Sequence, residues 1–135
     1  MALRMSTGCM DGLANLQGFS EIFNGGSIKI FTGESPGVEF GVTGVELVSG
    51  AITLSSSGNG AVAARFASTA GATGTAGYFR LSGLNDNPYI NSNGTAVRAD
   101  GVCGVNESFC EMLFTNAAMT SGENITVFGS FKIPE

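Results

Sequence analysis

The chain has 135 residues, of which 43% are hydrophobic and 13% charged, with a formal net charge of −5 and no histidine. This length predicts one domain with its own core, and the hydrophobic content excludes a charged disordered tail. The six basic residues stand singly, and no apolar run approaches the roughly 20 residues that span a bilayer. We therefore expect no nucleic acid and no membrane among its partners.

A short helical segment is predicted near the N-terminus. Within residues 10–24, Leu13 and Leu16 recur at helical spacing. Gly12 and Gly18 each cost up to about 1 kcal/mol inside a helix, so a broken pair of short helices is favoured over one long helix. The start of the chain lacks the apolar region of a secretory signal, which predicts a protein made in a cytoplasm.

Five strands are predicted next, because apolar and polar residues alternate with the period of a strand that has one buried face. They cover residues 27–32, 42–48, 51–55, 61–68 and 76–82. A tight hairpin turn is expected at Ser49 and Gly50, between the second and third strands. In the fifth strand, the alternation places Tyr78 and Arg80 on one face and Phe79 on the other.

The final part of the chain is rich in turn-forming residues and ends in the clearest strand. Residues 83–104 are predicted to be mainly loop, with residues 95–99 as a brief edge strand, while residues 107–115 fit either a strand or a helical turn. In the strand over residues 123–134, Phe128 falls on the face opposite to the apolar set. That set, which we expect in the core, is Ile125, Val127, Phe131 and Ile133.

Short strands separated by turn signals about every 8–12 residues favour a mainly all-β fold. We expect an antiparallel β-sandwich or a jelly-roll-like barrel over residues 25–135. Residues 1–24 are expected to form an N-terminal arm and the short helical segment.

No group of residues predicts catalysis, cofactor binding or a metal site. Without histidine, the commonest general base and metal ligand are absent, and no phosphate-binding or dinucleotide-binding glycine loop is present. Glu107 and Glu111 fit a solvated edge better than a catalytic pair. Asp86 lies among turn formers and offers too few carboxylates for a calcium loop.

The three cysteines leave two interpretations open. Cys103 and Cys110 are seven residues apart and would form a disulfide if they met across a hairpin, which leaves Cys9 as an odd thiol that cross-links to a neighbouring copy in an oxidising medium. Alternatively, all three are free, partly buried thiols of a protein made in a reducing cytoplasm.

Three motifs, in this order, resemble a family of small virion structural proteins of tailed bacteriophages. The motifs are F-N-G-G-S-I-K-I-F-T-G-E-S-P (residues 23–36), G-T-A-G-Y-F-R-L (residues 74–81) and S-G-E-N-I-T-V-F-G-S-F-K-I-P (residues 121–134), with R-A-D-G-V (residues 98–102) between the last two. The cysteines and the apolar segment around Cys110 depart from that pattern.

The resemblance implies a non-enzymatic protein of the virion, present in many copies and in contact with itself and with the major capsid protein. Capsid decoration is the first expected location, and a collar, neck or tail accessory role is the alternative. A host-surface or carbohydrate-binding module is the rival class. For assembly, we expect contacts from an arm over residues 1–9, or else a frayed terminus there. The candidate interface residues are Met1, Leu3, Met5 and Phe128.

Overall fold

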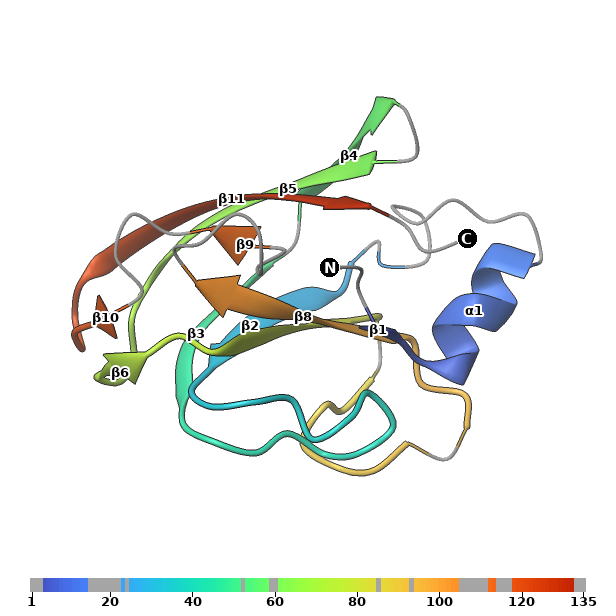
Figure 1. Cartoon of the computed structure of the whole chain (residues 1–135), viewed down its shortest axis with the longest axis horizontal. Coiled ribbons are helices and arrows are strands. Elements are labelled where there is room, and N and C mark those ends of the chain that lie inside the picture. Colours follow the sequence, from blue (N-terminus) through green and yellow to red (C-terminus); the bar gives the residue numbers. More distant parts are fainter. Residues whose placement is uncertain are drawn as a thin grey trace.

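The computed structural model of this chain consists almost entirely of β-strands (Figure 1). It describes residues 4–14, 23, 25–51, 53–58, 61–84, 86–92, 94–104, 112–113 and 118–132. The described elements are β1 (Arg4–Met5), α1 (Thr7–Ala14), β2 (Ser27–Phe31), β3 (Glu46–Ala51), β4 (Thr53–Gly58), β5 (Ala61–Thr69), β6 (Gly74–Thr75), β7 (Tyr78–Ser82), β8 (Arg98–Gly104), β9 (Met112–Leu113), β10 (Ala118–Met119) and β11 (Asn124–Lys132). The predicted mainly β class is confirmed.

The larger described sheet has the strand order β3-β2-β7-β8-β9-β11-β5-β4, with β1 paired to β8. Its neighbours are antiparallel except for β8 and β9, which run parallel, and β6 and β10 form a separate small antiparallel sheet. The antiparallel architecture is thus confirmed. Of the two expected forms, a sandwich or a jelly-roll-like barrel, a closed barrel is wrong, because β3 and β4 end the strand order and leave the sheet open.

Alternation along β2 and β7 directs one set of side chains into the core. Ile28 lies opposite Leu81 and Ile30 opposite Phe79, and all four side chains are buried in one apolar cluster. Burying such a side chain contributes about 1.5–3 kcal/mol. Ile125 of β11 packs against the same cluster, as its place in the predicted alternation requires.

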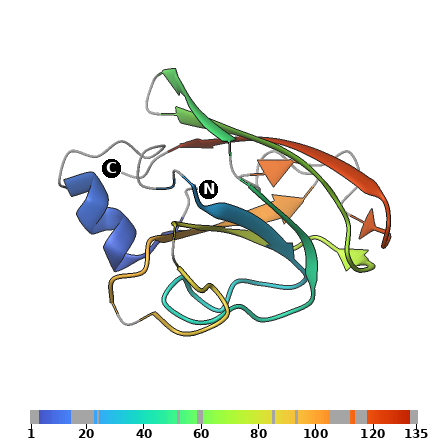
Figure 2. The same cartoon turned by 180° about the vertical axis from the view of Figure 1, so that it is seen from behind.

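The strands lie on two sides of the molecule (Figure 1). β4, β5 and β11 lie on one side, and β2, β7 and β8 on the other. Two loops lie outside β2, β7 and β8: the first loop (residues 33–45) and the second loop (residues 86–92 and 94–97). The view from behind shows the same arrangement (Figure 2).

Two local predictions about strands are wrong. The turn expected at Ser49 and Gly50 is absent, because both residues lie inside β3 and pair with Lys29 and Ile28 of β2. β4 pairs with β5 instead of forming a hairpin with β3.

The second error concerns residues 95–99, which were expected to form an edge strand. The strand is β8, which begins at Arg98 and lies between β7 and the short strands β1 and β9. Its turn-forming pair, Asp100 and Gly101, stays extended because the two residues pair with Arg80 and Phe79 of β7.

The N-terminal segment from Arg4 onward belongs to the sheet and the core. β1 pairs with β8, and Ser6 caps α1, because its Oγ accepts a hydrogen bond of 3.2 Å from the backbone N–H of Cys9. The helix therefore begins three residues before the predicted position. Residues 4–10 are integrated into the domain and do not form an arm ahead of it, while residues 1–3 lie outside the described part.

Candidate functional site

The face of β7 and β8 that points away from the apolar core carries buried charges. Arg80 lies opposite Asp100, and Arg98 lies opposite Ser82, on the face opposite to Phe79. Arg80 and Asp100 are fully buried, and Arg98 is 1% exposed. Buried charges require charged or hydrogen-bonding partners, and here those partners come from the two loops that cover this face.

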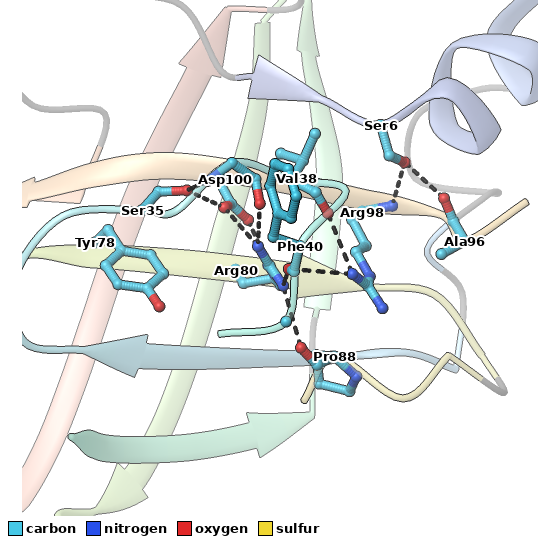
Figure 3. A network of polar contacts seen from close by, with 12 residues as sticks. Ser6, Ser35, Val38, Phe40, Tyr78, Arg80, Pro88, Ala96, Arg98 and Asp100 are labelled. Carbon is cyan, nitrogen blue, oxygen red and sulfur yellow. Dashed lines mark hydrogen bonds and ion pairs between the residues drawn. The ribbon is translucent and has the colours of Figure 1, made fainter. Parts of the chain in front are cut away.

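Arg80 uses all five N–H donors of its guanidinium group (Figure 3). Two bind the Asp100 carboxylate, from Nε to Oδ1 at 2.8 Å and from Nη2 to Oδ2 at 3.0 Å. The other three bind the carbonyl oxygens of Gly37, Phe40 and Pro88 at 2.6–3.1 Å. One side chain therefore holds both loops against the sheet.

Ser35 and Tyr78 attach the first loop at two more points. The Ser35 hydroxyl donates a hydrogen bond to Oδ2 of Asp100. The Tyr78 hydroxyl donates to the carbonyl of Thr43 at 2.7 Å and accepts from the N–H of the same residue at 3.1 Å. Burial raises the pKa of Tyr78 above its usual value, so its hydroxyl stays protonated as the donor.

Arg98 forms a second, parallel set of contacts. Its Nε and Nη2 bind both carboxylate oxygens of Asp86 at 2.8 and 3.1 Å. Nη2 also donates to the carbonyls of Asn87 and Ile90, and Nη1 donates to those of Val38 and Phe40. We call Arg80, Asp100, Arg98 and Asp86 the arginine clamp.

The arginine clamp brings the two loops side by side. Val42 N–H donates to the Pro88 carbonyl at 3.1 Å, and Ser92 N–H donates to the Glu39 carbonyl at 2.7 Å. The approach is closest at Gly41, where any side-chain carbon would collide with the carbonyl oxygen of Tyr89. The two loops are therefore hydrogen-bonded to each other as well as to the sheet.

The two loops display large apolar side chains to solvent. Phe40 is 55% exposed, Tyr89 52% and Ile90 59%. We call these three residues the loop face. The Tyr89 hydroxyl donates to Oε1 of Glu46 at 2.5 Å, which raises the pKa of Tyr89 to about 12, and the ammonium group of Lys29 lies 5.5 Å from the ring centre. Tyr89 is thus held in place although half of it is exposed.

A pocket of about 420 Å³ lies beside the loop face, within the second loop. Two charged residues line it, Asp86 and Arg98, and they bind each other. The rest of its lining consists of short polar and apolar side chains such as Asn91, Ser92 and Leu84. Such a lining suits hydrogen bonding and contact more than acid–base chemistry.

Two of the four residues predicted to form interfaces, Met5 and Phe128, lie in described strands. Met5 lies in β1 and packs against the apolar core, and Phe128 lies in β11 opposite Arg65 and Leu113. The role predicted for the Phe128 side chain stays a prediction. Met1 and Leu3 lie outside the described residues.

Among the cysteines, the structure gives the clearest evidence on the predicted role of Cys9. Its side chain is fully buried in the core, and burial raises its pKa to about 12. Both features oppose the cross-link proposed for it, because thiolates that react are exposed and have low pKa values. Cys103 is buried in β8. Cys110 lies outside the described residues, as do Glu107 and Glu111, so the disulfide stays a prediction.

The arginine clamp joins segments that the sequence motifs had marked separately. Ser35 comes from the first motif, Arg80 from the second, and Asp100 from the R-A-D-G-V segment. The sequence pattern predicts no role for these residues, and at Asp86 it indicates only a turn. The available signal was a set of arginines and aspartates placed singly in an otherwise weakly charged chain.

Comparison with protein-family models, with characterised proteins and with solved structures gives no significant match for this chain. Within the described residues, α1 and every other helical stretch fall short of the length and apolar character needed to cross a membrane.

Proposed function

We propose that this chain is a non-enzymatic structural protein of a tailed-bacteriophage virion, most consistent with a multi-copy decoration protein of the capsid. Its fold on this proposal is a two-layer β-sandwich, and its partners are the major capsid protein and further copies of itself. It is assembled in the host cytoplasm and acts in the virion, without a cofactor.

The observation that carries this proposal is the arginine clamp. The motifs that resemble the virion family supply Ser35, Arg80 and Asp100, and these residues support two loops that present the loop face. Exposed apolar side chains on ordered loops favour protein contact, because little conformational entropy is lost when they are covered.

The proposal is tested by counting copies in purified particles. We expect quantitative mass spectrometry to give a stoichiometry near that of the major capsid protein, and a reconstruction of the particle to place the loop face against the shell. A copy number in the range of a tail or portal ring would favour the collar, neck or tail alternative. Absence from the particle would refute a virion role.

The pocket beside the loop face supports one candidate of a different class, a carbohydrate-binding module of the host surface. Hydroxyl and amide side chains in its lining suit a sugar, and Ile90, which follows the exposed Tyr89 in the chain, also lines it. Binding of the isolated protein on a glycan array, lost in the Asn91→Ala variant, would favour this candidate over decoration.

A further inference from the structure

The two end strands of the open sheet differ in whether the backbone groups on their outer edges have hydrogen-bond partners. On β3, the carbonyl oxygen of Leu47 accepts a hydrogen bond of 2.8 Å from the N–H of Gly71. The carbonyl of Ser49 accepts one of 2.9 Å from the hydroxyl of Ser68. The edge of β3 is therefore covered by the chain that leaves β5.

The edge of β4 has no such cover among the described residues. β4 pairs with β5 on one side, and no described strand lies along its other side. Figures 1 and 2 show the β4–β5 hairpin at the periphery of the molecule, on the side opposite to the two loops. The backbone groups on this free edge need a partner or water.

The sequence of β4 lacks the usual protection of an edge strand. Natural edges are commonly blocked by charged side chains or proline, but no charged residue and no proline occurs between Glu46 and Arg65. One irregularity is present, a register shift between Ser56 and Gly58. It limits the regular edge to residues 53–56, which read T-L-S-S.

We propose that the free edge of β4 pairs antiparallel with β4 of a second copy, which joins the two sheets across a two-fold axis. In such a pair, each strand presents the same backbone donors and acceptors to the other. The same edge of each copy can therefore form the whole contact. A second copy fits better than a charged partner, because an edge without charges offers no electrostatic attraction to such a partner. It also meets itself without like-charge repulsion, although the chain carries a net charge of −5.

The pairing would leave the loop face of each copy uncovered, since the two loops lie on the far side of the molecule from β4. The dimer would therefore present two loop faces, and binding through both would increase avidity without new contacts. The pairing itself does not rest on the proposed virion role.

The test introduces a charge at Ser55 and measures mass in solution by sedimentation. The wild-type protein is expected at twice its chain mass of 13.7 kDa. Ser55→Lys and Ser55→Glu should each raise the dimer dissociation constant at least about tenfold, because each strand then meets its own charge. An equimolar mixture of the two variants should restore the dimer, since opposite charges now meet.

The control variant Ser121→Lys adds the same charge on an exposed turn and should keep the wild-type mass. Far-ultraviolet circular dichroism spectra of both Ser55 variants should match that of the wild type, so that loss of the dimer is not loss of the fold. A monomeric wild-type protein, or a dimer that both Ser55 variants retain, would overturn the pairing. Neither result bears on the copy number in particles, so the two proposals fail separately.

Discussion

Arg80 and Asp100 show how a small domain accommodates two charges away from water. Removing such ions from water costs several kcal/mol each, and their mutual attraction offsets this cost only when the remaining donors are satisfied. Here all five guanidinium donors have partners, and Ser35 satisfies a carboxylate oxygen. The pair therefore positions the loops more than it adds to stability.

Removing one member of this pair should be far more damaging than removing a surface charge. In Asp100→Asn, Arg80 keeps its charge without a carboxylate, and we expect the free energy of unfolding to fall by about 3–5 kcal/mol. The measurement is chemical denaturation. Asp86→Asn is the matched variant, and because its side chain is partly exposed, a smaller loss is expected. Equal small losses in both variants would contradict a structural role for the clamp.

The two tyrosines should resist ionisation in the folded state. The bond to Glu46 raises the pKa of Tyr89 to about 12, and burial raises that of Tyr78. Both pKa values are higher in the folded state than the usual 10.0. The protonated hydroxyls therefore contribute their full stabilisation of the folded state below pH 10. That stabilisation is lost as the pH rises through the raised pKa values.

An absorbance titration of phenolate measures this directly, because the chain has two tyrosines and no tryptophan. The folded protein should show little phenolate at pH 10, whereas the urea-unfolded chain should be about half ionised there. Glu46→Gln should return the pKa of Tyr89 toward its usual value and leave Tyr78 unchanged. A folded protein with half of its phenolate signal at pH 10 would contradict the Tyr89–Glu46 bond.

At the scale of elements, the N-terminal segment behaves as part of the sheet. Ser6 is fully buried, and its Oγ accepts bonds from the N–H groups of Cys9 and Arg98 while it donates to the carbonyl of Ala96. It therefore links α1 to β8 and to the second loop.

We therefore expect truncation of residues 1–9 to lower the free energy of unfolding of the domain. Removal of a separate arm would leave that free energy unchanged. The point variant Ser6→Ala removes the helix cap and leaves three backbone groups without their hydrogen-bond partner. We expect it to lower the free energy of unfolding by about 1–2 kcal/mol. Thr7→Ala, at the exposed neighbouring position, should cost much less. A truncated protein with wild-type stability would refute this account.

The strands that were predicted correctly are those in which the local alternation agrees with the pairing in the sheet. β2, β5, β7 and β11 each have a continuous antiparallel partner, so local pattern and sheet agree. β8 was misplaced because Asp100 and Gly101 are turn formers by local preference. Pairing with Arg80 and Phe79 of β7, which are distant in the sequence, keeps them extended.

The candidate site was predictable to a smaller extent. The motifs marked Ser35, Arg80 and Asp100 without showing that they meet, because their contact depends on strand order and not on spacing. The exposure of Phe40 and Ile90 could not be predicted either. We would expect the side chain of an apolar loop residue to pack beneath the loop. Here the backbone carbonyls of both residues point inward and accept hydrogen bonds from Arg98, and the side chains are exposed.

At the scale of the whole molecule, opposite sides are suited to different contacts. The two loops lie on one side and β4 on the other. If both proposals hold, the loops contact the shell while β4 contacts a second copy, and the two contacts do not overlap.

The loop face should govern incorporation into particles without governing the fold. Phe40→Ser combined with Ile90→Ser removes exposed apolar area, and because both side chains already contact solvent, we expect unfolding free energy to change by less than about 0.5 kcal/mol. Binding to particles that lack the protein should weaken at least tenfold, since a central pair of apolar contacts commonly contributes about 2 kcal/mol or more. Met10→Ser, at a residue of α1 that is 49% exposed, is the matched control and should bind like the wild type. Wild-type binding by the double variant would place the contact elsewhere, with Phe128 of β11 the next residue to substitute.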